Sequence, residues 1–330
     1  MKAYPLLLLA LLPYTTMTAQ DAAIQNNPPA ATFLQLSTDA RSLGMGGTGT
    51  AVANGNTAIF HNLSSAAFAM ESFGVHYSYT PATRHLQKDV LLNTVSGFCK
   101  LGRNQGLAIG YRHFGYPKTE ITDGEANLIG TSHPKEWALE AGYFTEISTN
   151  LSVGATLRYI QSDMGAATGL GKGKAYCFDL SATYRRMLSS IDEEAYWMAG
   201  VQLSSIGTKM KYDKDVKSSL PRKFSAGGSI NIPFTAYHQS ELLCTADVSY
   251  LFPTGMHCTE AGFGAEYTFM RYALLYGGYH LGNKEKGMGN YGTVGCGAQL
   301  PFAQCNFAYV LAGKESPLKN SWQISLSIGL

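Results

Sequence analysis

Residues Leu151–Tyr159 read Leu-Ser-Val-Gly-Ala-Thr-Leu-Arg-Tyr, with an apolar side chain at every second position. Successive side chains of a β-strand point to opposite faces, so the apolar residues share one face and Ser, Gly, Thr and Arg share the other. The C-terminal stretch Trp322–Leu330, WQISLSIGL, repeats this alternation. Segments of about ten residues with this pattern, separated by turns, are typical of transmembrane β-barrels. The alternation therefore predicts a chain that crosses a membrane with strands.

The same pattern predicts an all-β transmembrane fold, an antiparallel outer-membrane β-barrel of about 14 strands. Single-chain bacterial barrels have an even number of strands; twelve and sixteen are the alternatives, and the region 252–290 is where the count is least fixed. Short connections alternate with longer polar ones, as expected for periplasmic turns and outer loops. The predicted strands are 72–80, 89–100, 106–118, 135–147, 151–163, 173–187, 194–208, 221–233, 239–252, 258–269, 271–281, 289–300, 302–312 and 321–330.

The composition agrees with a barrel wall that has lipid outside and water inside. Charged residues make up only 15% of the 330 residues, whereas a soluble domain has about a quarter. Glycine and tyrosine are abundant, with 36 and 20 copies. The formal net charge of +2 gives no indication of a nucleic-acid partner.

The N-terminus has the features of an export signal. Lys2 precedes the apolar run Leu6–Leu12, and a cleavage site is expected between Ala19 and Ala23. No other segment is apolar enough over 18 residues to form a transmembrane helix. We therefore predict a signal peptide at 1–20, an N-terminal lead-in and plug (hatch) at 21–71, a barrel at 72–330, and localisation in the outer membrane of a Gram-negative bacterium.

The segment 33–71 does not alternate and is rich in Gly, Ala, Ser and Asn. Short helical elements with tight turns fit it better than strands, and it is expected in the periplasm or inside the lumen. Gly44, Gly46 and Gly49 match G-x-G-x-x-G, but no buried strand precedes them as a dinucleotide site requires. Their expected roles are turns with positive φ and close packing of the plug against the wall.

Charged side chains fall on the predicted inner face. An Arg or Lys facing lipid near the bilayer midplane would cost about 2–4 kcal/mol. The positions of the charged residues therefore strongly constrain which face of each strand points inward. Either the charges form a selective pore, or they form a salt-bridged network beside a plug; the mixture of signs favours the network. The residues are Arg112, Glu140, Arg158, Asp179, Arg185, Glu241, Asp247, Glu260 and Glu266.

The six cysteines and eight histidines show no metal-ligand spacing and no nucleophile motif. We therefore expect no enzyme activity, no metal and no cofactor. If Leu300-Pro301 forms the tip of a tight hairpin, Cys296 and Cys305 lie opposite each other. Two states are then open for this pair: a cross-strand disulfide, which an oxidising compartment permits, or two lipid-facing thiols, which is the favoured one.

One stretch resembles a known family. Phe33–Leu36, the run Asp39–Gly47, Ala51–Ala53 and Ala58–Asn62 are similar to the N-terminal region of the PorV/PorQ family, outer-membrane proteins of Bacteroidetes within the FadL-like barrel group. The family run "ARxLGMGGA…VA" is matched by Ala40–Gly47, while Leu63 stands where the family usually has Pro. The plug motif that carries the resemblance comprises Ala40, Arg41, Gly44, Gly46, Gly47 and Asn62.

The resemblance implies a fourteen-stranded barrel whose N-terminal segment folds into or under the lumen. It also implies a non-enzymatic partner or scaffold in type IX-like protein secretion and surface attachment, in contact with outer-membrane lipid and with secretion proteins or exported cargo. The alternative is a FadL-like channel for a hydrophobic ligand, with a pocket near the plug lined by Phe33, Leu34, Ile59, Phe60 and Phe68. A surface-modifying enzyme is the third hypothesis, and no motif supports it.

Overall fold

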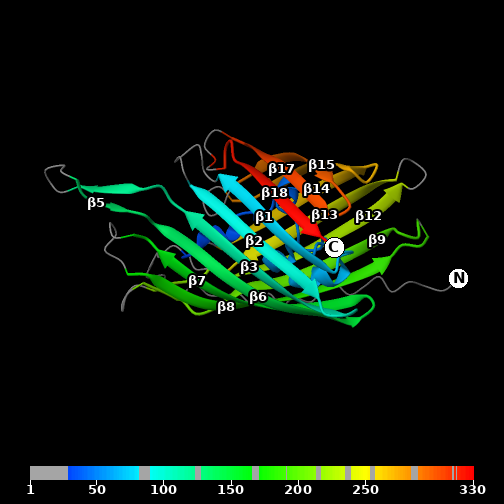
Figure 1. Ribbon diagram of the computed structural model, residues 1–330, viewed down its shortest axis with the longest axis horizontal. Coiled ribbons are helices and arrows are strands. Elements are labelled where there is room, and N and C mark those ends of the chain that lie inside the picture. Colours follow the sequence, from blue (N-terminus) through cyan, green and yellow to red (C-terminus); the bar gives the residue numbers. More distant parts are fainter. Residues whose placement is uncertain are drawn as a thin grey trace, which may run out of the picture.

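The computed structural model describes residues 29–81, 90–122, 128–165, 171–190, 192–212, 217–234, 239–252, 257–283, 289–313, 316 and 318–330. Fourteen of its strands form a closed antiparallel β-barrel, which confirms the predicted fold class and strand number (Figure 1). The predicted signal peptide at 1–20 lies outside the described residues. The barrel strands are β1 (Phe73–Pro81), β2 (Leu91–Lys100), β3 (Gln105–Gly115), β6 (Lys135–Ser148), β7 (Leu151–Asp163), β8 (Gly173–Met187), β9 (Tyr196–Gly207), β12 (Lys223–Phe234), β13 (Ser240–Leu251), β14 (Cys258–Phe269), β15 (Ala273–Leu281), β16 (Tyr291–Gln299), β17 (Ala303–Ala312) and β18 (Trp322–Gly329).

Each strand pairs with the next barrel strand along the chain, and the last strand pairs with the first. β1 and β18 are joined by six residue pairs, from Gly74 opposite Gly329 to Tyr79 opposite Ile324. Closure leaves the wall without an unpaired sheet edge, which a strand protein needs inside a bilayer. Among the described residues no helix is long and apolar enough to cross a membrane.

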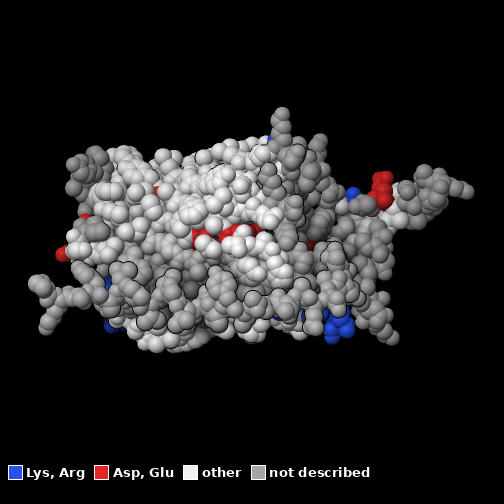
Figure 2. Space-filling view, turned by 180° about the vertical axis from the view of Figure 1, so that it is seen from behind, with Lys and Arg blue, Asp and Glu red and all other residues white. Residues whose placement is uncertain are grey.

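The outer face of the wall is apolar. Leu157, Leu275 and Val248 are each at least half exposed to the outside of the barrel. In Figure 2 the charged residues on the visible face gather near its two ends, apart from a small acidic area at mid-length. Aromatic pairs such as Tyr79–Trp322 and Trp137–Tyr159 lie near strand ends, where membrane proteins concentrate Tyr and Trp. These features define the band that contacts lipid.

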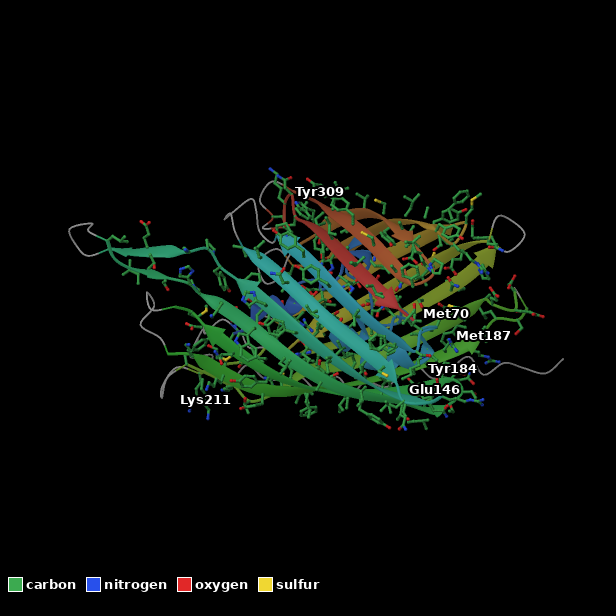
Figure 3. All side chains as sticks on the ribbon, viewed as in Figure 1. Met70, Glu146, Tyr184, Met187, Lys211 and Tyr309 are labelled. Carbon is green, nitrogen blue, oxygen red and sulfur yellow. The ribbon has the colours of Figure 1, made fainter. Side chains whose placement is uncertain are left out.

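The two ends of the barrel differ. Short turns at 101–104, 149–150 and 300–302 lie at the end that also holds the C-terminus, where the Leu330 N–H donates to Phe73 O. Figure 3 shows Met70, Glu146, Tyr184 and Met187 at this short-turn end, with Lys211 and Tyr309 toward the other. Outer-membrane barrels place short turns in the periplasm, so we assign the short-turn end to that side and the loop end to the outside.

Two segments that the sequence indicates as loops contain strands. β4 (Thr119–Thr122) and β5 (Leu128–Ser132) form a separate hairpin that extends beyond the barrel at the loop end (Figure 1). β10 (Met210–Lys211) and β11 (Lys217–Ser218) add a short pairing next to β8. These elements are too short to carry a distinct alternation.

The register of the β16–β17 hairpin corrects one expectation. Cys296 lies opposite Phe307 and Cys305 lies opposite Ala298, so the two cysteines are not directly paired. Both are exposed on the outer face and free. Four residues, 300–303, separate the last pair Gln299–Gln304, two more than in a two-residue tip, and the register is shifted by two residues. The disulfide is therefore not formed, and the alternative of two outward thiols describes this face.

Four short helical elements lie inside the barrel and form the plug, which we define as residues 29–71. They are η1 (Thr32–Gln35), α1 (Ala40–Gly44), η2 (Ala58–Phe60) and η3 (Leu63–Phe68). The helix α1 contacts β15, β16, β17 and β18, whereas η3 contacts β6, β7 and β8. The plug thus spans the lumen from one side of the wall to the other.

Candidate functional site

The first turn of α1 is stabilised by two partners of one carboxylate. Asp39 is the N-cap residue, and its Oδ1 accepts from the Ser42 backbone N–H at 2.8 Å. Its Oδ2 lies 2.7 Å from His61 Nε2. Burial by itself raises the pKa of Asp39, but the hydrogen bond and charge of His61 and the Ser42 N–H together lower it from 3.8 to about 2. Asp39 therefore joins α1 to the end of η2.

The arginine of the plug motif connects the plug to the wall. Arg41 donates from Nε to Glu266 Oε2 at 2.6 Å and from Nη2 to Oε1 at 2.8 Å. This two-pronged arrangement matches the planar guanidinium to the carboxylate. The Glu266 side chain is 5% exposed. Burial disfavours the charged guanidinium, yet the neighbouring carboxylate raises the pKa of Arg41 above its usual range.

The glycines of the plug motif permit close contact with the wall. Gly46 and Gly47 have φ of 73° and 80°, the left-handed region that glycine adopts at little cost. At Gly46 a Cβ would also collide with the backbone of Phe263 and Tyr279. The Gly46 N–H donates to Thr293 Oγ1, which in turn donates to Gly44 O. The turn after α1 therefore needs glycine for both its conformation and its packing.

The wall has complementary glycines on its inner face. A side chain at Gly264 or Gly278 would collide with Met45 of the plug, and one at Gly200 would collide with Thr50. Further inward glycines approach other plug residues in the same way. They are Gly110, Gly142, Gly154 and Gly262.

Asp247 and Asn62 hold the plug segment between α1 and η3. Asp247 Oδ2 accepts from the N–H groups of Gly49 and Thr50, both at 2.8 Å. Asn62 caps η3 by accepting from Ser64 and donates to Thr50 O and Thr183 Oγ1. Side-chain caps of this kind replace the missing partners of the first turn.

Leu63, which replaces the usual family proline, is the first residue of η3. The first helical position suits proline because its N–H has no helical partner. Leucine meets the same backbone requirement, and its side chain is 2% exposed within a cluster that includes Phe144. The local turn therefore does not depend on proline.

The predicted inner-face charges form a ladder across four strands. Arg112 donates to Glu140 at 2.8 Å, and Arg158 donates to Glu140 and, at 2.6 Å, to Asp179. Asp179 also accepts from the Ser205 N–H. All four charged side chains are at most 4% exposed. Their signs alternate and their charges are mutually paired, so this part of the lumen is a network and not a row of free charges.

Two arginines of this inner face also contact the plug. Arg112 donates to Leu34 O at 3.0 Å, and its guanidinium lies 4.6 Å from the centre of the Phe60 ring. Arg185 donates to Phe68 O and lies 4.6 Å from that residue's ring. Of the remaining predicted charges, Glu241 accepts from Asn231, and Glu260 lines the chamber described next.

Two adjoining pockets of about 120 Å³ and 60 Å³ lie between the plug and the loop end, and we call them together the luminal chamber. Several residues of the plug and the wall border both pockets at once, so the two pockets adjoin each other. The shared lining is Gly47, Phe60, His61, Lys223, Ser249, Glu260 and His280. The sequence does not single out Lys223 as a site residue. Only its position in the alternation indicates an inward side chain, because it shares a strand face with Ser225 and Asn231.

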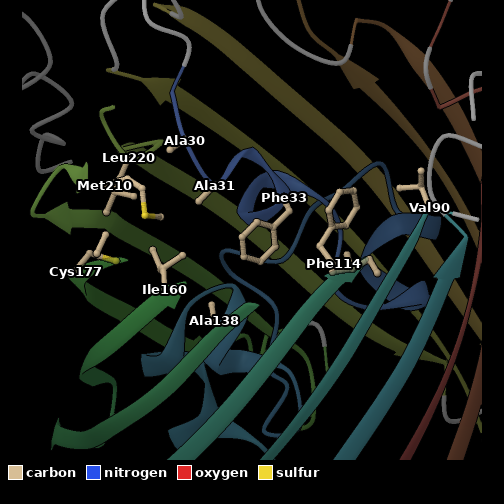
Figure 4. Packing of buried hydrophobic residues seen from close by; sticks show 12 residues of the cluster. Ala30, Ala31, Phe33, Val90, Phe114, Ala138, Ile160, Cys177, Met210 and Leu220 are labelled. Carbon is tan, nitrogen blue, oxygen red and sulfur yellow. The ribbon is translucent and has the colours of Figure 1, made fainter. Parts of the chain in front are cut away.

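The predicted apolar pocket is only partly correct. Leu34 and Phe60 line the luminal chamber, but the other three residues pack elsewhere. Phe33 lies 6.1 Å from the Phe114 ring in a cluster near the loop end (Figure 4). Ile59 joins the cluster around Phe144, and Phe68 packs on Ala51 and Met198. Phe33, Ile59 and Phe68 therefore belong to three different plug–wall clusters and do not share one pocket.

Within the described part of the chain, no group of three or more His, Cys, Asp or Glu is placed to hold a metal ion. The site is thus a plug fixed by ion pairs and hydrogen bonds, with a chamber above it, inside a closed barrel.

Residues 18–256 match the family model described as "Type IX secretion system protein PorV", a span that contains the whole plug and β1 to β13. The chain belongs to the PorV family. A search of curated proteins found no match.

Solved transporters and channels share the fold of this PorV family chain. The Pseudomonas putida toluene transporter TodX aligns with a TM-score of 0.60 at 13% identity, over 88% of this chain and 98% of the other. The Ralstonia pickettii toluene transporter TbuX gives 0.57 at 14%, over 90% and 100%. The monoaromatic hydrocarbon channel CymD gives 0.54 at 11%, over 90% and 98%. These likenesses show the fold.

Proposed function

We propose that this protein is a non-enzymatic outer-membrane scaffold for type IX-like protein secretion, working as a partner of secretion proteins or exported cargo. The PorV family match over residues 18–256 carries the proposal. The plug supports it, because charged or hydroxyl side chains on β2, β3, β7, β8, β12, β13, β14 and β16 hold it in the lumen. A barrel filled by its own chain is suited to binding other proteins on its exposed surfaces. On this proposal a cleaved signal at 1–20 directs the chain to the outer membrane of a Gram-negative bacterium.

The test is purification of the tagged protein from its native outer membrane in mild detergent, with mass spectrometry of proteins and lipids. We expect stoichiometric recovery of secretion components or exported cargo. A strain lacking the protein should retain those cargo proteins in the periplasm, and the wild-type gene should restore their export. A barrel recovered alone, with normal export in the deletion strain, would refute the scaffold role.

A second candidate is a channel for small hydrophobic molecules. The luminal chamber favours it, since its larger pocket of about 120 Å³ includes Leu34 and Phe60 and an apolar cavity of about 150 Å³ can hold benzene. Uptake of labelled toluene by cells with and without the protein separates the two roles. Faster, protein-dependent uptake together with normal export would favour the channel.

A further inference from the structure

Two opposite charges, Lys223 and Glu260, line both pockets of the luminal chamber, whereas Arg112 and Asp247 each line one of them. Lys223 begins β12 and Glu260 lies near the start of β14, with Ser249 on the strand between them. Lys223 is level with Leu251 and Glu260 is level with Ser249 on β13. Strand spacing and rise place the two Cα atoms about 12 Å apart. Both side chains line both pockets of the chamber.

Lys223 and Glu260 differ from the paired arginines of the lumen. Arg41, Arg112 and Arg158 each form an ion pair with a carboxylate. Among the residues that the structure describes, neither Lys223 nor Glu260 forms one. A positive and a negative group therefore face the same chamber without forming an ion pair with each other.

Neutral polar atoms at the chamber also lack protein partners. The Oε1 of Gln323, the Oγ of Ser321 and the Oγ1 of Thr80 are buried and accept or donate no hydrogen bond within the described chain. Their residues are 0%, 3% and 8% exposed and line the larger pocket. Buried polar groups of folded proteins nearly always have a partner. These atoms thus indicate a polar occupant.

Apolar side chains also line the chamber, next to the polar side chains of Ser321 and Gln323. Leu34 and Leu36 of the plug and Val310 and Leu318 of the β17–β18 region line it. The adjoining pockets of about 120 Å³ and 60 Å³ can hold a molecule slightly larger than benzene. The occupant therefore has a compact apolar part as well as charged groups.

We propose that the luminal chamber binds a small zwitterion with a compact apolar side chain, in the chemical class of a free α-amino acid such as valine. Its carboxylate is directed to Lys223, its ammonium to Glu260, and its side chain to Leu34 and Val310. A ligand with one charge would leave the other wall charge without a partner inside the lumen, which is costly. A neutral hydrocarbon would leave both wall charges without a partner. This proposal does not depend on the secretion role.

The test is equilibrium binding to the purified full-length barrel in detergent. L-Valine is the probe; isovalerate lacks only its ammonium, isobutylamine lacks only its carboxylate, and toluene has no charge. We expect saturable binding of valine, at least tenfold tighter than that of each analogue. Lys223→Met and Glu260→Gln should each weaken valine binding at least tenfold. Lys211→Met, an exposed lysine at the same end, should leave it unchanged.

Several results would overturn the proposal. The first is no valine binding by wild-type protein that shows the gel shift of a folded barrel. The second is isovalerate binding as tight as that of valine and kept in Glu260→Gln, which would indicate an anion site. The third is binding of toluene alone. If a variant does not fold, the four-ligand comparison on the wild-type protein still decides.

Discussion

The carboxylate of Glu266 illustrates how single residues fix the plug. It is almost fully buried on the inner wall, and both of its oxygens accept from Arg41. A buried charge is tolerated only when it is paired and hydrogen-bonded. The ion pair therefore stabilises the docked plug chiefly because its loss would leave a carboxylate without a partner.

Replacing Arg41 by Met should release the plug while the barrel remains folded. Removing one partner of a buried pair typically costs about 3–5 kcal/mol, because the other charge stays buried. We expect faster proteolysis of residues 29–71, measured on protein whose gel shift shows an intact barrel. Arg41→Lys should give an intermediate rate, since lysine cannot bond both oxygens in the same plane. Unchanged protection in Arg41→Met would show that the Arg41–Glu266 ion pair is not needed for docking.

The Asp39 carboxylate predicts an acid-dependent loosening of α1. Its pKa in the folded protein is about 2, below its ordinary value of 3.8. A depressed pKa means that the stabilisation is present above about pH 4 and is lost as the pH falls toward 2. Protection of the plug from an acid-active protease should therefore decrease between these pH values. Asp39→Asn should be less protected at neutral pH and should show a weaker pH dependence; the same steep dependence in this variant would exclude Asp39 as its source.

At the scale of elements, local alternation was sufficient to predict most of the wall. The predicted strands 151–163 and 173–187 coincide with β7 and β8, because parity is set by each strand's own two faces. Register is different, since it depends on the number of residues in the turn. The misplaced pairing of Cys296 with Cys305 has this origin. The β4–β5 hairpin could not be predicted because its strands have only four and five residues.

The packing of β14 against the plug can be tested with two glycines of neighbouring strands. Gly264 faces the plug, and a side chain there would collide with Met45; Gly277 faces outward with open space around it. Gly264→Val should displace the plug, because overpacking costs about 1–3 kcal/mol, whereas Gly277→Val should not. Single-channel conductance in a planar bilayer should rise only in Gly264→Val. Equal conductance of the two variants would contradict this account of the inner glycines.

At the scale of the whole molecule, the sequence predicts only part of the site. The inward direction of Arg112, Glu140 and Asp179 could be predicted, but their partners could not, because ion pairs between neighbouring strands depend on the register. The luminal chamber is even harder to predict from the sequence. It forms where the plug ends below the loop end, and that boundary results from contacts between residues more than a hundred positions apart, such as Gly49 with Asp247.

The orientation of the wall in the bilayer gives a depth-dependent prediction. Leu157 lies at the centre of β7 and is 71% exposed, whereas Ile147 lies at the short-turn end of β6 and is 63% exposed. An arginine facing lipid costs about 2–4 kcal/mol at the midplane and about 0–1 kcal/mol near the interface. Leu157→Arg should therefore lower the free energy of unfolding in lipid vesicles by several times more than Ile147→Arg, measured by denaturant titration of both variants. If the two substitutions cost the same, β7 does not cross the bilayer at the depth that the apolar band indicates. Because both side chains are similarly exposed, the comparison separates the effect of depth in the membrane from the effect of exposure. A larger cost for Leu157→Arg would show that the apolar face predicted by the alternation in Leu151–Tyr159 contacts lipid.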